Sequence, residues 1–157
     1  MNHCYVLDCD PDWEETVSFE LKDFGIKHYL AMESRSVRMG RKGGKQIAIE
    51  VPMLPGIIFV WGELYELFNL RHKIRHIDGI WVARAGTGVP VHVPQTDLER
   101  FRSEVENYLI TCRASIAKGQ RPPAKPAKLA INLGELKEHK TQVLHRLGFG
   151  IVERETT

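Results

Sequence analysis

The chain has 157 residues, of which 43% are hydrophobic and 27% are charged, which suits one packed domain with an appendage. It has no apolar run near the roughly 20 residues of a membrane span, and its acidic N-terminus is unlike a signal peptide, so we expect a cytoplasmic protein without membrane contact. Three cysteines lack paired metal-ligand spacing and are expected to be reduced and inert: Cys4, Cys9 and Cys112.

The formal net charge of +2 hides an uneven distribution of charge along the chain. Residues 1–34 hold eight acidic side chains and two lysines, whereas residues 35–45 hold five basic side chains and no acid. Basic residues are also concentrated at 71–76 and 118–128. Because phosphate is attracted by nearby cations rather than by net charge, these local patches are more informative than the total.

The N-terminal elements follow from capping residues and apolar spacing. Residues 4–7 predict a short strand. Asp10 suits an N-cap and Pro11 the first helical position, so we expect a helix that starts here and ends at Gly25. The buried stripe of this helix is predicted to be Trp13, Val17, Leu21 and Phe24.

The next segment predicts strands separated by turns. Residues 26–38 are expected to be extended, residues 39–44 to form an exposed glycine-rich turn, and residues 47–51 to form a half-buried strand with alternating apolar side chains. Residues 57–61 are apolar throughout, as in a central strand covered on both faces. The bend at 52–56 contains two prolines and a glycine, which interrupt a sheet ladder.

The C-terminal half predicts further helices. We expect a helix from Leu64 towards Ile74, a strand at 80–83, and a helix opened by a capping box of Thr96 and Glu99. The apolar face of that last helix comprises Leu98, Phe101, Val105, Tyr108, Leu109 and Cys112. The order of elements indicates an α+β fold with a mostly antiparallel sheet.

The remaining residues divide into a linker and a tail. Residues 118–128 form a stiff, basic, proline-rich linker. The tail, residues 129–157, is expected to contain one short helix that ends at Gly148. The apolar side of this helix comprises Leu136, Val143, Leu144 and Leu147.

No catalytic or metal-binding pattern stands out. Asp8, Asp10 and Asp12 alternate like the start of a calcium loop, but Trp13 replaces its required glycine. Two histidines, His72 and His76, are spaced for a shared metal but lack a third ligand. The glycine-rich segment 38–45 lacks the ending of a phosphate-binding P-loop. We therefore expect neither an enzyme nor a cofactor.

Three segments in one register carry a family resemblance: CYVLDCDPDWEETVSFELKDFGIKHYLAM, then VPMLPGIIFV, then HIDGIWVARAGTGVPVHVPQTDLERF. Together they resemble the N-terminal (NGN) domain of the NusG family of transcription elongation and antitermination factors, over about residues 3–110. The resemblance implies a ferredoxin-like sandwich with a four-stranded, mostly antiparallel sheet and about three helices, at residues 1–117. Residues 129–157 are too few for the family's KOW barrel, which suggests a specialised paralogue.

The resemblance also implies a partner. In this family the domain docks on the clamp helices of the largest RNA polymerase subunit, reaches the second-largest subunit, and suppresses pausing and termination. By this resemblance the docking residues are expected to be Tyr5, Leu54, Pro55, Gly56, Ile57 and Phe59. We expect the bend to present Leu54 and Ile57 outward. The segment expected to meet the second subunit begins with Arg71, His72 and Lys73.

The basic residues 35–45 are expected to contact DNA of the transcription bubble through Arg35, Arg38, Arg41, Lys42 and Lys45. One hypothesis for the tail is that residues 135–147 pack on the docking surface and mask it, and the alternative is a tail packed elsewhere. A second interpretation of the whole chain is a stand-alone nucleic-acid-binding module of ferredoxin-like fold, in which the proline-glycine bend is simply core.

Overall fold

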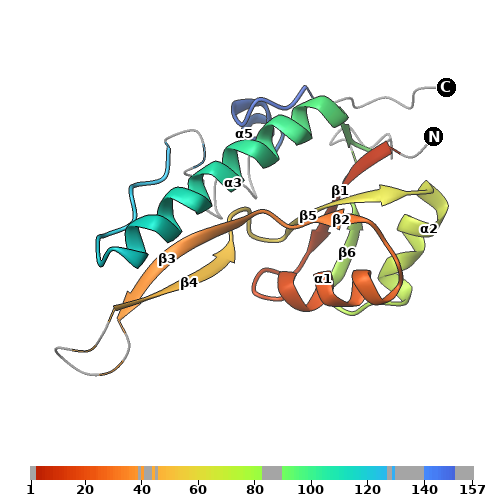
Figure 1. Cartoon of the computed structure of the whole chain (residues 1–157). Coiled ribbons are helices and arrows are strands. Elements are labelled where there is room, and N and C mark those ends of the chain that lie inside the picture. The colour runs from red at the N-terminus through yellow and green to blue at the C-terminus, as the bar shows by residue number, and fades with distance from the viewer. Residues whose placement is uncertain are drawn as a thin grey trace.

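The structure is a computed structural model that describes residues 3–38, 40, 44, 46–82, 90–126, 129 and 140–150. An antiparallel sheet separates two layers of helices, with α3 and α5 on one side and α1 and α2 on the other (Figure 1). The helices are α1 (Glu14–Asp23), α2 (Leu64–Asn69), the 3-10 helix η1 (Leu70–His72), α3 (Gln95–Ala117) and α5 (Lys140–Arg146).

The main sheet has five strands in the part of the chain that is described, one more than the four expected. Its order is β2-β5-β1-β6, and β7 also pairs with β1. The additional strand is the two-residue β7, which is too short to be recognised from alternation of side chains. The strands of this sheet are β1 (His3–Cys9), β2 (His28–Tyr29), β5 (Ile57–Gly62), β6 (Ile77–Ile80) and β7 (His92–Val93).

Strand β5 occupies the interior of the sheet, as its apolar sequence predicts, because it pairs with β1 on one side and β2 on the other. Side chains alternate between faces with the period of two that strands impose. Ile57 and Phe59 point towards α3, whereas Ile58 and Val60 point towards α1 and α2. Both faces of this strand are therefore buried.

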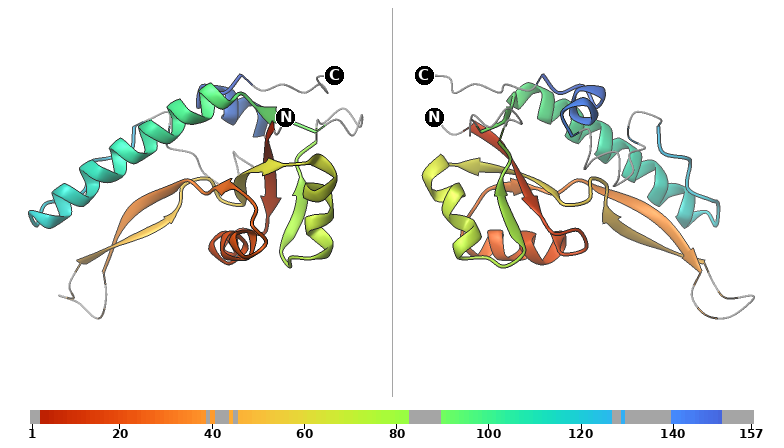
Figure 2. Two further views of the ribbon diagram at one scale, coloured as in Figure 1. Left: turned by 45° about the vertical axis from the view of Figure 1, so that its right-hand side comes forward. Right: turned by 180° about the vertical axis from the view of Figure 1, so that it is seen from behind.

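The remaining strands, β3 (Met32–Arg38) and β4 (Gln46–Pro52), pair with each other and form a separate two-stranded ribbon. Figure 2 shows this ribbon extending away from the main sheet beside α3. Residues 47–50 of β4 are all exposed, so the expectation of a half-buried strand there is wrong. The alternation is present, but these residues lie on the ribbon that extends away from the main sheet (Figure 2), and the contact of Arg113 in α3 with Glu50 leaves them exposed.

Helix α1 begins at Glu14 rather than beside Asp10, and its N-cap residue Trp13 makes no side-chain capping hydrogen bond. Asp10 is engaged elsewhere: its carboxylate lies 3.0 Å from Nδ1 of His76. The indole of Trp13 stacks on the same imidazole with ring centroids 3.9 Å apart. Trp13 is 44% exposed and Phe24 is 51% exposed, so the prediction that both belong to the buried stripe of this helix is wrong. A contact distant in sequence thus displaces the predicted start of the helix.

Helix α3 also starts differently from the prediction. It begins at Gln95 after Pro94, and Thr96 lies within its first turn, where it cannot serve as the N-cap. Gln95 instead accepts a hydrogen bond from the indole N–H of Trp61 at 2.9 Å. The helix has 23 residues, a length of about 35 Å, and therefore extends past the sheet along the ribbon (Figure 1).

Candidate functional site

The proline-glycine bend between β4 and β5 is fixed by the loop that precedes α1. Gly56 has a φ of 77°, and a Cβ atom at this position would lie 2.8 Å from the carbonyl oxygen of Cys9. The Gly56 carbonyl accepts a hydrogen bond from the Cys9 amide at 2.9 Å. Its own amide donates to the buried carboxylate of Glu14 at 3.0 Å. Only glycine fits this close approach of two backbones.

The side chains on either side of Gly56 are not presented outward. Leu54 and Ile57 are 1% and 2% exposed, and Phe59 is completely buried. The expectation that the bend displays Leu54 and Ile57 is therefore wrong for this conformation of the chain. The apolar face that they form with Phe59, called here the bend face, belongs to the cluster between the sheet and α3.

The C-terminal tail covers part of that cluster. Phe149 is 1% exposed, and its ring centroid lies 5.5 Å from that of Phe59 and 5.1 Å from that of Phe101 in α3. Leu129 belongs to the same cluster. The tail helix α5 contributes Val143 and Leu144 to this cluster. Leu147, the residue directly after α5, belongs to it as well.

Polar contacts fix the end of the tail to the first turns of α3. The Gly150 amide donates to the carboxylate of Asp97 at 2.8 Å, and Arg100 Nη2 donates to the Gly148 carbonyl at 2.6 Å. A Cβ atom at Gly148, where φ is 95°, would lie 2.5 Å from the Arg100 guanidinium. Gly148 is therefore both the end of the helix and the place where Arg100 approaches the backbone.

The tail residues that sequence analysis missed had a recognisable signal. The Phe149 amide donates to the Leu144 carbonyl and the Gly148 amide to the His145 carbonyl, the pattern of a Schellman motif. An apolar residue directly after the terminating glycine usually packs back on its helix. Phe149 could have been included in the apolar side of the tail on this ground. No signal in the sequence pointed to Asp97 or Arg100.

The structure does not bring all the expected docking residues together. The side chain of Tyr5 lies on the face of the sheet opposite to the bend face, in the cluster covered by α1 and α2. Pro55 is half-buried beside Gly56. Arg71, His72 and Lys73 are exposed on η1 and the turn after it, on the α2 side of the sheet.

Most of the expected nucleic-acid contacts fall in the sequence between β3 and β4. Arg41, Lys42 and Lys45 lie outside the described residues, and of Arg38 only the backbone, in β3, is described. Arg35 lies nearer to the sheet on β3, is exposed, and donates to the Glu33 carboxylate from Nε at 3.3 Å and Nη2 at 3.0 Å. The ribbon is attached to α3 by Arg113, whose Nε donates to Glu50 at 2.9 Å.

The two cysteines of β1 lie on opposite faces of the sheet. Burial raises the pKa of the Cys4 thiol to about 12, and burial, aided by the nearby Glu14 carboxylate, raises the pKa of Cys9 to about 12. Because the thiolate is the reactive form, a raised pKa together with burial makes both sulfurs poor nucleophiles.

We expect both β1 thiols to react with a disulfide reagent at about pH 8 roughly a thousandfold more slowly in the folded chain than in urea. Mass spectrometry of labelled peptides measures each rate separately. Rapid labelling of Cys4 in the folded chain would contradict its burial.

The described part of the chain holds no group of three or more histidine, cysteine or acidic side chains that could bind a metal ion. Among the same residues, no helix is both long and apolar enough to span a membrane. What the described chain offers is a bend face covered by a tail, and a ribbon that extends beyond the sheet.

A family model described as "Transcription termination factor nusG" matches residues 2–102. The chain belongs to the NusG family. This is a family of transcription factors rather than of enzymes, so a role in transcription follows from membership. A comparison with curated proteins finds no match for the chain. The family match ends within α3, so the linker and the tail that covers the bend face lie outside it.

Proposed function

We propose that this chain is a transcription elongation and antitermination factor that docks on the clamp helices of the largest RNA polymerase subunit. The observation that carries the proposal is the contact between Phe59 of the bend face, an apolar surface of the family domain, and Phe149 in a short segment outside the family match. Apolar anchors in a central patch supply most of the energy of a protein interface. Leu54, Ile57 and Phe59 would be those anchors once the tail has left.

The proposal assigns the parts of the chain different tasks. Residues 1–117 act as the docking domain, residues 118–128 as the linker, and residues 129–157 as the tail. The exposed segment at Arg71, His72 and Lys73 contacts the second-largest subunit, so that the factor bridges the DNA channel. A bridged channel favours processive transcription and suppresses pausing and termination. Such a factor works in the cytoplasm, on the nucleoid, where polymerase transcribes.

The tail masks the docking surface in this proposal. Support comes from Phe149, Leu144 and Val143, which lie in the same cluster as the bend face. The earlier part of the proposed mask, residues 135–139, lies outside the described residues. Docking then requires displacement of α5, so the apparent affinity for polymerase depends on the fraction of chains with a released tail.

The test is binding of the full chain to purified core RNA polymerase, together with an elongation assay on a template with defined pauses. The same measurements are made on a variant with a released tail, Phe149→Asp. We expect the variant to bind core polymerase and shorten the pauses. If neither chain binds core polymerase, the proposed function is wrong.

The basic segment between β3 and β4 is expected to supply contacts to the bubble DNA. Reversing two of its cations, Arg41→Glu with Lys42→Glu, should lower the slope of log affinity against log salt by about two, because one counterion is released per phosphate contact. The measurement is binding to an elongation complex over a range of salt concentrations. Reversal of two exposed cations outside the ribbon, Lys22 and Lys118, is the matched control. An equal loss of slope in both variants would mean that the ribbon makes no specific contact.

A second candidate function is that of a stand-alone nucleic-acid-binding module. The burial of Leu54 and Ile57 favours it, since in this alternative the bend is part of the core. The two functions differ in their partner. A stand-alone module binds oligonucleotides with equal affinity before and after release of the tail and does not bind core polymerase.

A further inference from the structure

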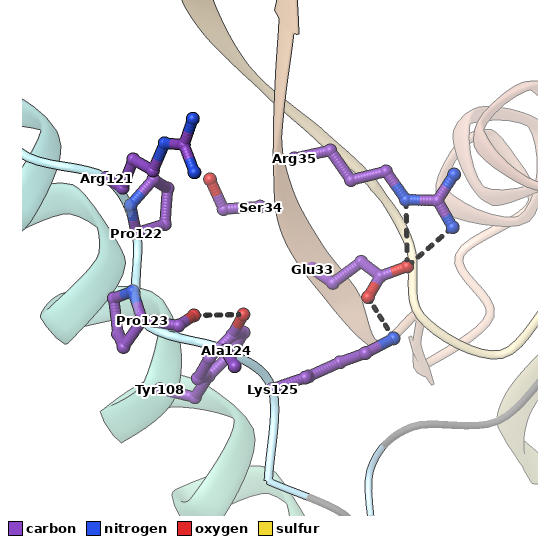
Figure 3. A pocket seen from close by; sticks show the side chains of 9 residues that line it. All are labelled: Glu33, Ser34, Arg35, Tyr108, Arg121, Pro122, Pro123, Ala124 and Lys125. Carbon is purple, nitrogen blue, oxygen red and sulfur yellow. Dashed lines mark hydrogen bonds and ion pairs between the residues drawn. The ribbon is translucent and has the colours of Figure 1, made fainter.

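The proline-rich linker lies against the base of the ribbon (Figure 3). A pocket of about 460 Å³ that is open to solvent lies between β3, α3 and linker residues 121–125. We call the segment 121–126 the linker strap. The sequence alone predicted only a stiff basic spacer, whereas the structure shows its side chains and backbone engaged with two elements of the domain.

The central contact of the linker strap is to Glu33, a carboxylate on β3 whose residue is only 3% exposed. One oxygen of Glu33 accepts from Arg35 on the same strand. The other oxygen forms an ion pair with the ammonium group of Lys125. Figure 3 shows Lys125 reaching across from the strap to this carboxylate. Because Glu33 is buried, water screens this ion pair less than it screens an exposed one. Removal of Lys125 would leave the buried carboxylate without this partner, which is costly.

A second contact joins the strap to α3. The Tyr108 hydroxyl donates to the Pro123 carbonyl at 3.2 Å. Tyr108 is half-buried on the side of α3 that faces the ribbon, and it lines the same pocket. The strap is thus fixed at two successive places, Pro123 and Lys125, shortly before the chain reaches Leu129.

We propose that the Lys125–Glu33 ion pair acts as a latch that keeps the tail on the bend face. Leu129 follows Lys125 closely and is buried in the same cluster as α5. When the strap is fixed, the tail is tethered from Lys125 rather than from the end of α3. A shorter tether raises the effective concentration of the tail at its site and favours the closed state. The consequence for polymerase recruitment rests on the proposed function, but the latch itself does not.

The test compares full-length chains by amide hydrogen exchange, without polymerase. Lys125→Met removes the charge and retains the aliphatic part of the side chain. We expect the amides of α5 and Phe149 to exchange roughly tenfold faster in this variant, whereas those of the main sheet stay unchanged. Lys118→Met, at an exposed linker lysine, is the matched control and should leave the tail unchanged.

A second variant, Tyr108→Phe, tests the strap in the case that Lys125→Met disturbs the fold. Tyr108→Phe removes one hydroxyl from the strap contact and should also accelerate exchange in α5, by a smaller factor. Faster exchange of the whole sheet in Lys125→Met would indicate unfolding, and Tyr108→Phe then decides. Tail exchange equal to that of the wild-type chain in Tyr108→Phe, and in a folded Lys125→Met chain, would overturn the latch.

Polymerase binding of the same variants separates the two proposals. A Lys125→Met chain with an open tail and unchanged polymerase affinity would support the latch and contradict masking. An unchanged tail in Lys125→Met, combined with tighter polymerase binding by Phe149→Asp, would reject the latch and leave the proposed function intact.

Discussion

Replacement of Phe149 by aspartate is expected to release α5 and to strengthen binding to core RNA polymerase by roughly tenfold or more. Phe149 is buried between Phe59 of the sheet and Phe101 of α3. Loss of a buried aromatic ring costs about 3–5 kcal/mol, and an unpaired carboxylate in the same place adds to that cost. The cost falls on tail docking, because the strands that pair in the main sheet all lie outside the tail.

The matched control for this variant is Phe19→Asp. Phe19 lies on α1, on the other side of the sheet, and is 66% exposed, so the same chemical change removes little buried surface. Binding is measured by titration of core polymerase, and tail release by hydrogen exchange of α5. Faster exchange in α5 without tighter polymerase binding would mean that the docking surface is elsewhere.

Replacement of Gly56 by alanine is expected to lower the free energy of unfolding of the domain by about 3 kcal/mol or more. Two costs combine at this residue. The φ of 77° is unfavourable for any residue with a Cβ atom, and the added atom would lie 2.8 Å from the Cys9 carbonyl oxygen. Relief of that contact requires the bend or β1 to move, which breaks the hydrogen bonds from Gly56 to Glu14 and from Cys9 to Gly56.

The control for Gly56 is Gly25→Ala, which isolates the backbone cost. Gly25 has a similar φ of 72°, but no atom lies within 4 Å of its added Cβ. We expect that variant to lose about 1 kcal/mol. Urea denaturation of both variants gives the difference, which is the cost of the clash with Cys9. Equal losses of unfolding free energy in the two variants would show that the bend accommodates the added Cβ atom without a further cost.

Features encoded locally were predictable from the sequence. The apolar run of β5 required a strand covered on both faces, and the structure has it in the interior of the sheet. The helical spacing of Leu98, Phe101 and Val105 placed these residues on the buried side of α3. Gly25 lies in the turn after α1, just past the C-cap residue Phe24. In each of these cases the spacing of apolar residues or a terminating glycine was a sufficient signal, because the residues that decide the structure are neighbours along the chain.

Features that depend on distant residues were not predictable. Asp10 looks like an N-cap, but it pairs with His76, which lies beyond seven further elements. Leu54 and Ile57 lie beside prolines in a bend, where exposed residues are common, yet both are buried in the cluster that the sheet forms with α3 and the tail. Glu33 is an ordinary acidic residue in the sequence, and only the folded chain brings Lys125 to it. A short apolar or charged motif does not specify its partner when that partner is the far end of the same chain.

The length of α3 has a consequence for how this chain can vary. Asp97 and Arg100 near its start hold the tail, Tyr108 in the middle contacts the linker, and Arg113 near its end contacts the ribbon. An inserted residue would rotate the part of the helix after it by about 100° around the helix axis, so the contacts before and after the insertion could no longer form together. Single substitutions along the helix alter one contact at a time, whereas an insertion or deletion between these residues changes the orientation of one group of contacts relative to the other. Helix length is therefore expected to be constrained more tightly than helix sequence.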